Sequence, residues 1–363
     1  MKRLFFIALI ILLFAMGGIL IIQRTQVDTD VTAKTTKVGV LISGICLDRS
    51  WCQTHYEALE SLKEELNLEI IYKEHAPGDC YADIKDLIEK QGCRIIIGCS
   101  FDYGEAMKKA AIEYPHVYFL HAAGNYHQAN FSSYFGRMYQ ARYLSGIVAG
   151  KKTQTGQIGY VAAFSISEVL RGINAFTLGV RSVRPDAVVH VKYCKSWTDD
   201  APALNSCRKL LDEFPIDVVT VHTNSLAPHQ EADSRGVWFV GYHRDNRDLF
   251  INTYLVACVW DWSAYYREQI LNCLQGKFHG KQVWIDKEKG IVSLSPPTPY
   301  VDMDTAILVR QVSEKFNSRG FDVFYGPIKD NQGNLRIKAG ESMSDDEMLN
   351  GFDWYVEGVN VED

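Results

Sequence analysis

The feature that most constrains the fold is a regular alternation of short apolar runs with longer amphipathic stretches, which begins at Lys37. The apolar runs are rich in Val and Ile, as is typical of strands buried on both faces of a parallel sheet. The amphipathic stretches have the period of helices. The alternation therefore predicts an α/β fold with helices on both faces of a parallel sheet. Before residue 150 we expect strands at 38–42, 68–74, 94–100 and 116–122, separated by helices at 55–66, 81–91 and 104–114.

The alternation starts a second time near residue 157. Here we expect strands at 157–164, 187–194, 217–223, 237–242 and 253–260, with helices at 167–183, 201–214 and 229–236. The polar stretch KKTQTGQ, which follows Gly150, separates the two series and is a candidate hinge. Two doubly wound units joined by a hinge predict a two-lobed protein, with a ligand cleft at the facing carboxyl ends of the strands. We assign residues 37–150 and about 258–290 to lobe 1, and residues 151–257 and about 291–363 to lobe 2.

An apolar segment precedes this body. Leu4 to Ile22 carries no charge and follows Lys2 and Arg3. Its length is close to the roughly 20 residues that cross a bilayer as a helix, and the basic start also fits an export signal. We read residues 1–26 as a signal peptide or transmembrane anchor, with the anchor favoured, and residues 27–36 as a tether. Either reading leaves the body on the extracytoplasmic side, membrane-anchored or periplasmic.

Composition and motifs exclude several classes of function. The net charge is -6, and an acidic body argues against a nucleic-acid binder. The sequence lacks the G-x-S-x-G, H-E-x-x-H and G-x-x-x-x-G-K-[ST] motifs, and no dinucleotide fingerprint follows the first strand. We therefore expect no cofactor and no catalytic residues. Asp102 and Asp245 remain the alternative, as a general acid/base pair.

The nine cysteines allow two readings. In an exported protein some would pair, and Cys46 with Cys52 or Cys194 with Cys207 are candidate bridges. They equally fit small buried hydrophobic side chains. No CxxC occurs, and the spacings do not match a zinc site, so no metal site is expected.

Residues directly after the expected strands are the candidates for binding, because parallel strands end at the same edge of a sheet. They combine aromatic rings with carboxylates and amides, which suits a flat heterocycle with N–H groups, such as a purine. The members include Asp48, Trp51, Phe101, Asp102, Phe164, Glu168, Asn224, His243, Asp245, Trp260 and Trp262. Trp260 and Trp262 lie two residues apart in an extended segment, so Trp262 is also a candidate for packing.

Several long segments carry a resemblance to a known family. They are residues 134–187 (from YFGRMYQARYLSG), HTNSLAP at 222–228, GYHRD at 241–245, VWDWSAYY at 259–266 and the tail at 324–349. With them the chain resembles the basic membrane protein family of type I periplasmic binding proteins, which includes purine nucleoside receptors of ABC importers. The resemblance covers nearly the whole chain after the tether. It implies a type I fold, a cleft that closes on a purine stacked against aromatic rings, and an ABC permease as partner.

The resemblance also implies roles for individual residues. Trp51 would be the stacking platform. The remaining contacts would come from both lobes, through Phe101, Phe164, Asn174, Asn224, Asp245 and Trp260.

Three positions depart from the family pattern. The branch with a tryptophan after the first strand, associated with adenine-like purines, usually has Gly before that tryptophan, where this chain has Ser50. Asn224 and His243 each stand where that branch has aspartate. An amide and an imidazole can donate hydrogen bonds, which a carboxylate cannot, so an oxopurine becomes more plausible, and loss of the usual ligand is also open. The first cysteine is Cys46, so a lipid-modified N-terminal cysteine is not expected.

Together these observations predict a solute-binding protein that captures a purine-type base or nucleoside for an ABC importer, and not an enzyme. A membrane-tethered sensor with the same fold is the alternative. A nucleoside-processing enzyme that uses Asp102 or Asp245 is the third hypothesis.

Overall fold

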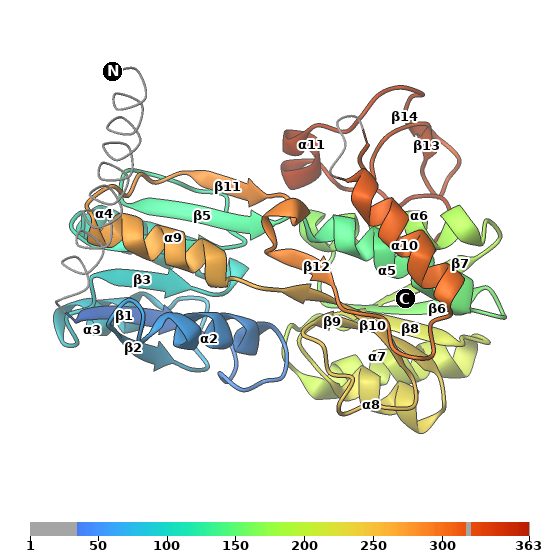
Figure 1. The fold of residues 1–363 in the computed structure, drawn as a ribbon, viewed down its shortest axis with the longest axis horizontal. Coiled ribbons are helices and arrows are strands. Elements are labelled where there is room, and N and C mark those ends of the chain that lie inside the picture. The colour runs from blue at the N-terminus through green and yellow to red at the C-terminus, as the bar shows by residue number, and fades with distance from the viewer. Residues whose placement is uncertain (1–34, 317–320, 363) are drawn as a thin grey trace, which may run out of the picture.

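The computed structural model describes residues 35–316 and 321–362 (Figure 1). The expected signal or anchor and most of the expected tether lie outside these residues. Within the described ranges no helix is both long enough and apolar enough to cross a membrane.

The first of two large sheets has six parallel strands in the order β11-β5-β4-β3-β1-β2. Helices cover both of its faces, with α2 packed beside α9 and α3 beside α4. Continuous apolar runs explain the central strands, in which Val38, Val40 and Ile97 are fully buried. The elements are β1 (Thr36–Leu41), α2 (Trp51–Leu62), β2 (Leu68–Lys73), α3 (Tyr81–Glu89), β3 (Ile95–Gly98), α4 (Gly104–Glu113), β4 (Tyr118–Ala122), β5 (Phe131–Gly136), α9 (Ser263–Leu274) and β11 (Gln282–Ile285).

The second sheet has seven strands in the order β12-β10-β9-β8-β6-β7-β15, all parallel except β12. Helices α5 and α6 pack against each other on one face, and α7 and α8 pack together on the other (Figure 1). The elements are α5 (Met138–Lys152), β6 (Gln157–Ala162), α6 (Ser167–Val183), β7 (Val188–Tyr193), α7 (Asp200–Glu213), β8 (Val218–His222), α8 (Ala227–Ser234), β9 (Trp238–His243), β10 (Tyr254–Trp260), β12 (Val292–Leu294) and β15 (Val359–Glu362). Helix α10 (Met303–Lys315) packs on α5, and the short elements β13 (Ile328–Lys329), β14 (Leu335–Ile337) and α11 (Asp345–Asn350) lie near the end of the chain.

The prediction of an α/β fold with parallel sheets is confirmed, and each predicted strand is present within a few residues. The stretch after Gly150 differs from the prediction, because α5 continues to Lys152 and packs along α6 rather than ending at a hinge. Glycines allow this close packing. A Cβ on Gly179 would lie 2.0 Å from the carbonyl oxygen of Tyr143. Helix α5 therefore lies with the second sheet, although residues up to 150 were expected in lobe 1.

The chain passes between the two sheets at three places in the described structure. They lie after β5, after β10 and between β11 and β12. These crossings lie side by side, since Asp261 N donates to Ile291 O at 2.9 Å and Arg137 N donates to Ile285 O at 2.9 Å. Gly136 lies against Trp260, and a Cβ on this glycine would come within 2.7 Å of the indole ring. Residues far apart in sequence thus form the junction of the two lobes.

Candidate functional site

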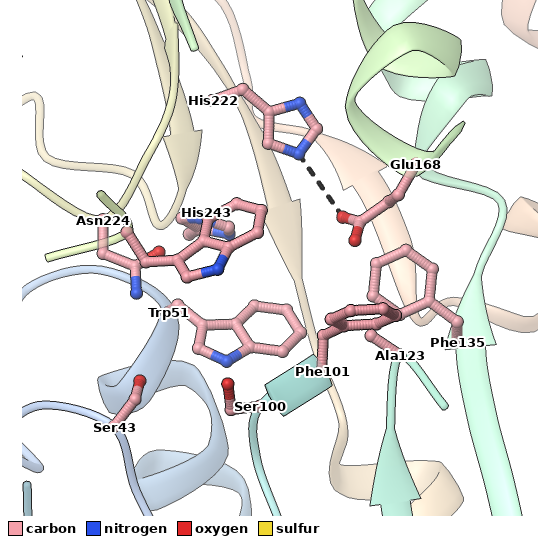
Figure 2. A pocket seen from close by; sticks show the side chains of 11 residues that line it. Ser43, Trp51, Ser100, Phe101, Ala123, Phe135, Glu168, His222, Asn224 and His243 are labelled. Carbon is pink, nitrogen blue, oxygen red and sulfur yellow. Dashed lines mark hydrogen bonds and ion pairs between the residues drawn. The ribbon is translucent and has the colours of Figure 1, made fainter. Parts of the chain in front are cut away.

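A cavity that is partly open to solvent lies between the two sheets at the carboxyl ends of their strands (Figure 2). Seven strands contribute a lining residue from their carboxyl end or from the segment that directly follows. They are β1, β3, β4, β5, β7, β8 and β9. The lining residues are Ser43, Trp51, Ser100, Phe101, Ala123, Phe135, Glu168, Trp197, His222, Asn224 and His243. The location matches the general rule for ligand sites in parallel α/β sheets.

Trp51 forms part of the floor of the cavity as the first residue of α2. Its side chain is 8% exposed, and its Nε1 donates to the carbonyl oxygen of Cys99 at 2.6 Å. This hydrogen bond fixes the ring without using its faces. Phe135, from the end of β5, lies 6.2 Å from Trp51 between ring centroids. Phe101, from the loop after β3, is 48% exposed and completes an aromatic surface suited to a flat ligand.

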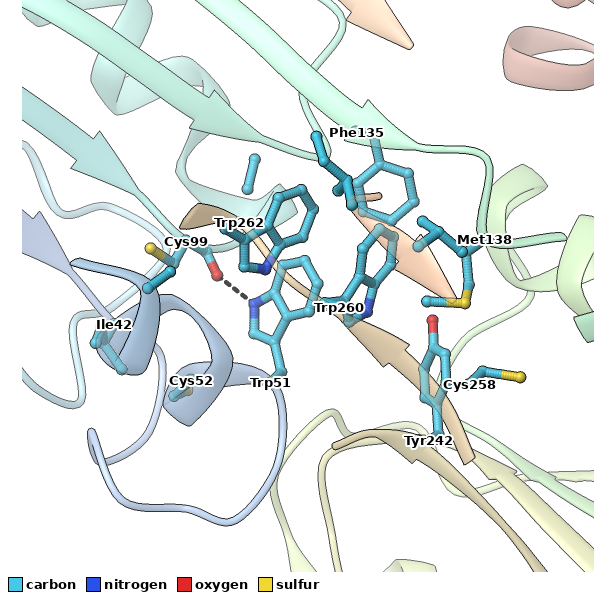
Figure 3. Close-up of a cluster of buried hydrophobic side chains, with 14 of the residues drawn as sticks. Ile42, Trp51, Cys52, Cys99, Phe135, Met138, Tyr242, Cys258, Trp260 and Trp262 are labelled. Atoms are coloured by element: carbon cyan, nitrogen blue, oxygen red, sulfur yellow. Dashed lines mark hydrogen bonds between the residues drawn. The ribbon is translucent and has the colours of Figure 1, made fainter. Parts of the chain in front are cut away.

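Trp260 supports this surface from behind and is not among the lining residues (Figure 3). It stacks on Trp262 with ring centroids 4.6 Å apart and 14° between planes, and it meets Trp51 edge-on at 5.6 Å. Trp262 is fully buried, and its Nε1 donates to Thr54 Oγ1 at 3.2 Å. Trp262 therefore packs in the interior, which is the alternative given for it above. Trp260, which was expected to contact the ligand, also packs there.

Glu168 and His222 form the polar wall on the side of the second sheet (Figure 2). Glu168 Oε1 lies 3.4 Å from His222 Nε2. Burial raises the pKa of Glu168 to about 7, although Arg171 and Arg142 oppose the rise. Burial also holds the pKa of His222 well below its ordinary value, and the same two arginines lower it further. The imidazole is therefore neutral, and Glu168 is the group of this pair that titrates near neutral pH.

The remaining wall comes from the loops after β7 and β8 and from the end of β9. Asn224 N donates to the carbonyl oxygen of Trp197 at 2.7 Å, which ties two lining loops together. His243 has a φ of 67°, in the left-handed region. Its Nδ1 accepts a hydrogen bond from Trp260 Nε1 at 3.1 Å. An amide and an imidazole thus stand on this wall, at the two positions where the family resemblance implied carboxylates.

The structure brings three of the predicted site residues to the cavity, namely Trp51, Phe101 and Asn224. Phe164 is close by, because its ring packs on Trp197 with centroids 5.3 Å apart, but it does not line the cavity. Asn174, which the resemblance implied as a contact, is not among the lining residues. It is fully buried in α6, where its Nδ2 donates to Trp354 O at 2.7 Å and its Oδ1 accepts from Val356 N at 3.0 Å.

Three predicted carboxylates also do not line the cavity, and each interacts with neighbouring residues of the chain instead. Asp48 accepts hydrogen bonds from the backbone N–H groups at the start of α2, including Gln53 N at 2.9 Å. Asp102 is exposed and bonds back to Ser100. Asp245 forms an ion pair with Arg247 at 2.6 Å. The hypothesis of a catalytic pair made by Asp102 and Asp245 therefore has no support from their positions.

Several lining residues had no role assigned to them from the sequence. Glu168 and His243 were candidates only as residues that follow strands, and His222 was not among the candidates. Trp197 was missed, although it follows β7 in the way that the rule for strand ends requires. Phe135 was missed because β5 was not predicted.

A wider cavity adjoins the first and shares Phe101, Ala123, Phe135 and Glu168 with it. Leu349 and Asn350 of α11 line its far side. Two arginines hold this end of the chain in place. Arg137 pairs with Asp345, and Arg171 Nη1 donates to the carbonyl oxygen of Met348. A ligand larger than a single base could extend into this space.

No cluster of side chains suited to a metal ion occurs among the described residues. All nine cysteines are buried and unpaired. The bridges considered for Cys46 with Cys52 and Cys194 with Cys207 are not formed, which leaves the reading as small buried hydrophobic side chains.

Comparisons with known proteins agree with this architecture. The family model described as ABC transporter substrate-binding protein, PnrA-like, matches residues 35–321. A purine-binding protein of Brucella abortus is 34% identical over 328 residues, which cover 89% of this chain and 93% of the relative. A putative ABC transporter glucose-binding protein of Haloferax volcanii is 32% identical over 317 residues, covering 87% and 78%. The transcriptional activator protein med of Bacillus subtilis is 25% identical over 297 residues, covering 81% and 92%.

Solved structures share the fold. An ABC transporter solute-binding protein from Aeropyrum pernix has a TM-score of 0.70 at 16% identity, covering 88% of this chain and 98% of its own. A transcriptional activator of the comK gene from Bacillus halodurans has a TM-score of 0.68 at 23% identity, covering 78% and 99%.

Proposed function

Because the chain belongs to the PnrA-like family of ABC transporter substrate-binding proteins, we propose that it captures a purine-type nucleobase or nucleoside outside the cytoplasm for an ABC importer. The observation that carries the proposal is the cavity between the lobes, where Trp51, Phe101 and Phe135 offer aromatic surfaces. Glu168, Asn224 and His243 supply hydrogen-bonding groups around them. A planar heterocycle with polar edges needs this combination.

Capture would proceed by closure of the two lobes about the three adjacent crossings. Contacts between the opposite lobes, from the loop after β9 to α2 and to the loop before α2, support this step. Arg244 Nη2 lies 3.1 Å from Glu57 Oε1, and Asn246 Nδ2 donates to the carbonyl oxygen of Arg49 at 2.8 Å. A ligand shifts the equilibrium toward closure only through contacts that exist in the closed state. Residues from both lobes line the cavity, so a bound base would make such contacts.

Glucose is the competing ligand, because one relative is named for it. The cavity favours the purine. Glu168 is the only carboxylate among the lining residues, and its Oε1 already faces His222. A sugar with a hydroxyl on nearly every carbon needs more acceptors than this wall offers, whereas a purine uses the aromatic surfaces.

Thermal unfolding of the purified chain with a panel of ligands tests the proposal. The panel holds purine bases, their nucleosides and glucose. A ligand at a hundred times its Kd adds about 2.7 kcal/mol to the free energy of unfolding, which is a readily measured shift in Tm. We expect at least one purine base or nucleoside to stabilise the protein. Stabilisation by glucose alone, or by no member of the panel, would refute the proposal.

A membrane-tethered sensor is the second candidate. The relative of Bacillus subtilis that is named a transcriptional activator favours it, as does the apolar segment at 4–22, which lacks cysteine. Isolation of the chain from membranes distinguishes the two candidates. Recovery of a permease and its ATPase supports transport, and recovery of a signalling protein supports sensing.

A further inference from the structure

One hydrogen bond fixes the tautomer of a histidine in the cavity wall. An indole Nε1–H can only donate, so His243 Nδ1, at 3.1 Å from Trp260 Nε1, must be the acceptor. A neutral imidazole then carries its proton on Nε2. Burial holds the pKa of His243 well below its ordinary value, which keeps the ring neutral. His243 therefore has a donor at Nε2 and no freedom to exchange it for an acceptor.

This donor has no partner. His243 is 5% exposed, and Nε2 makes no hydrogen bond to any residue that the structure describes. A buried polar group without a partner is costly, so such groups are rare in folded proteins and require an explanation. His243 borders the cavity, and its Nε2 is covered in the ligand-free protein, so a ligand that displaces the covering side chains can supply the missing acceptor.

The surroundings hold the donor rigidly. The His243 ring packs on Tyr242 with centroids 3.7 Å apart and lies 5.3 Å from Trp51. Its partner Trp260 is held between Trp262 and Phe135, at centroid distances of 4.6 and 4.9 Å. Both rings of the hydrogen-bonded pair are buried among these neighbours, which supports a fixed proton on Nε2.

Resting on the proposed function, we infer that the cavity selects 6-oxopurines over 6-aminopurines, and that His243 Nε2–H is the selecting group. An oxopurine offers a carbonyl oxygen to this donor, and its adjacent ring N–H can donate to Asn224 on the same wall or to Glu168 on the polar wall. The amino group of adenine can only donate at that position. This amino group would face the His243 donor, and both donors would remain unpaired. A polar site discriminates most strongly between two ligands when one of them leaves buried polar groups without partners.

A matched pair of substitutions tests the inference. His243→Asn and His243→Asp have side chains of nearly equal size, and both residues tolerate the positive φ at this position. Asn keeps a donor, whereas Asp only accepts. Titration calorimetry would give the Kd of each protein for hypoxanthine and for adenine. We expect the wild type to prefer hypoxanthine by about tenfold or more, which corresponds to one hydrogen bond. His243→Asn should keep this preference, and His243→Asp should lose or reverse it.

A second measurement tests the fixed tautomer without any ligand. Nitrogen-15 NMR of the imidazole, assigned through the loss of its signals in His243→Asn, should show Nδ1 unprotonated in the wild type. Trp260→Phe removes the donor, so a mixture of tautomers should appear. Equal tautomers in the wild type would overturn the inference.

The outcomes separate the two proposals. Wild-type affinity for adenine equal to or above that for hypoxanthine, or an unchanged ratio in His243→Asp, overturns the inference and leaves purine binding intact. The absence of binding by any purine overturns both.

Discussion

Glu168 Oε1 and His222 Nε2 lie 3.4 Å apart in the wall of the cavity, and their pKa values are displaced in opposite directions (Figure 2). Burial raises the pKa of Glu168 to about 7 and holds that of His222 well below its usual range. The charge of this wall near neutral pH therefore depends on the carboxyl group, while the imidazole stays neutral.

The affinity for a purine should depend on the ionisation of Glu168. A ring N–H of the ligand donates best to the ionised carboxylate, so the affinity should rise as the pH rises through about 7 and then level off. In Glu168→Gln the affinity should be lower and nearly independent of pH. Titration calorimetry between pH 5.5 and 8.5 measures both. An affinity that falls as pH rises would show that the protonated carboxyl group is the form that binds.

The stability of the ligand-free protein should depend on the same group with the opposite sign. The folded state binds the proton of Glu168 more tightly than the unfolded state does. The pKa of the carboxyl group is about 7 in the folded protein and 4.5 in the unfolded chain. The stabilising contribution is therefore complete below pH 4.5 and is lost as the pH rises through about 7. Its upper bound is roughly 3 kcal/mol, from a displacement of about 2.5 pKa units. Urea unfolding across this range should show the loss in the wild type. The same loss in Glu168→Gln would assign it to another group.

Phe101→Ala should weaken binding and leave the fold intact. The side chain lines both cavities but is 48% exposed, so little buried area is lost from the core. Loss of one stacking ring should cost about 1–3 kcal/mol, or a roughly five- to 150-fold rise in Kd. Ile112→Ala is the matched control, because Ile112 is 64% exposed on α4 and does not line either cavity. Equal affinity in the two variants would exclude Phe101 as a contact.

Asn174→Ala should show the reverse pattern. Its amide holds Trp354 O and Val356 N, so its removal leaves two backbone groups in the interior without partners. We expect a loss of about 3 kcal/mol in the free energy of unfolding and no change in Kd for the protein that remains folded. Reduced affinity at unchanged stability would restore the contact role that the family resemblance implied.

Gly179→Ala should destabilise the protein strongly. The new Cβ would lie 2.0 Å from the carbonyl oxygen of Tyr143, and backbone atoms cannot give way as the end of a side chain can. We expect a loss of roughly 3 kcal/mol or more, at the upper end for overpacked cores. Gly104→Ala is the control, because its Cβ would meet only His121 at 3.4 Å. A Gly179→Ala variant as stable as the control would contradict the packing of α5 on α6.

The strands that the sequence predicts well are those with continuous apolar runs, such as β6 and β10. Strand β5 was not predicted, because Ser132 and Ser133 interrupt its apolar run. Both serines are fully buried, and Ser132 Oγ accepts from Lys281 N at 3.0 Å. Their burial depends on a partner segment far along the chain. Local periodicity does not contain that information.

The candidate site was predictable to the level of strand ends but not of side chains. The rule found Trp51, Phe101 and Asn224 because a loop after a strand must lie at that edge of the sheet. It could not tell that Asp48 would accept hydrogen bonds from the start of α2, or that Asp245 would pair with Arg247. These choices depend on loop conformation, which has no periodic signal.

A crystal structure of the protein grown with saturating hypoxanthine tests the central claim most directly. We predict a purine ring against Trp51 and Phe101, with its carbonyl oxygen within hydrogen-bonding distance of His243 Nε2. An empty cavity at saturation, or a purine bound elsewhere on the molecule, would contradict it.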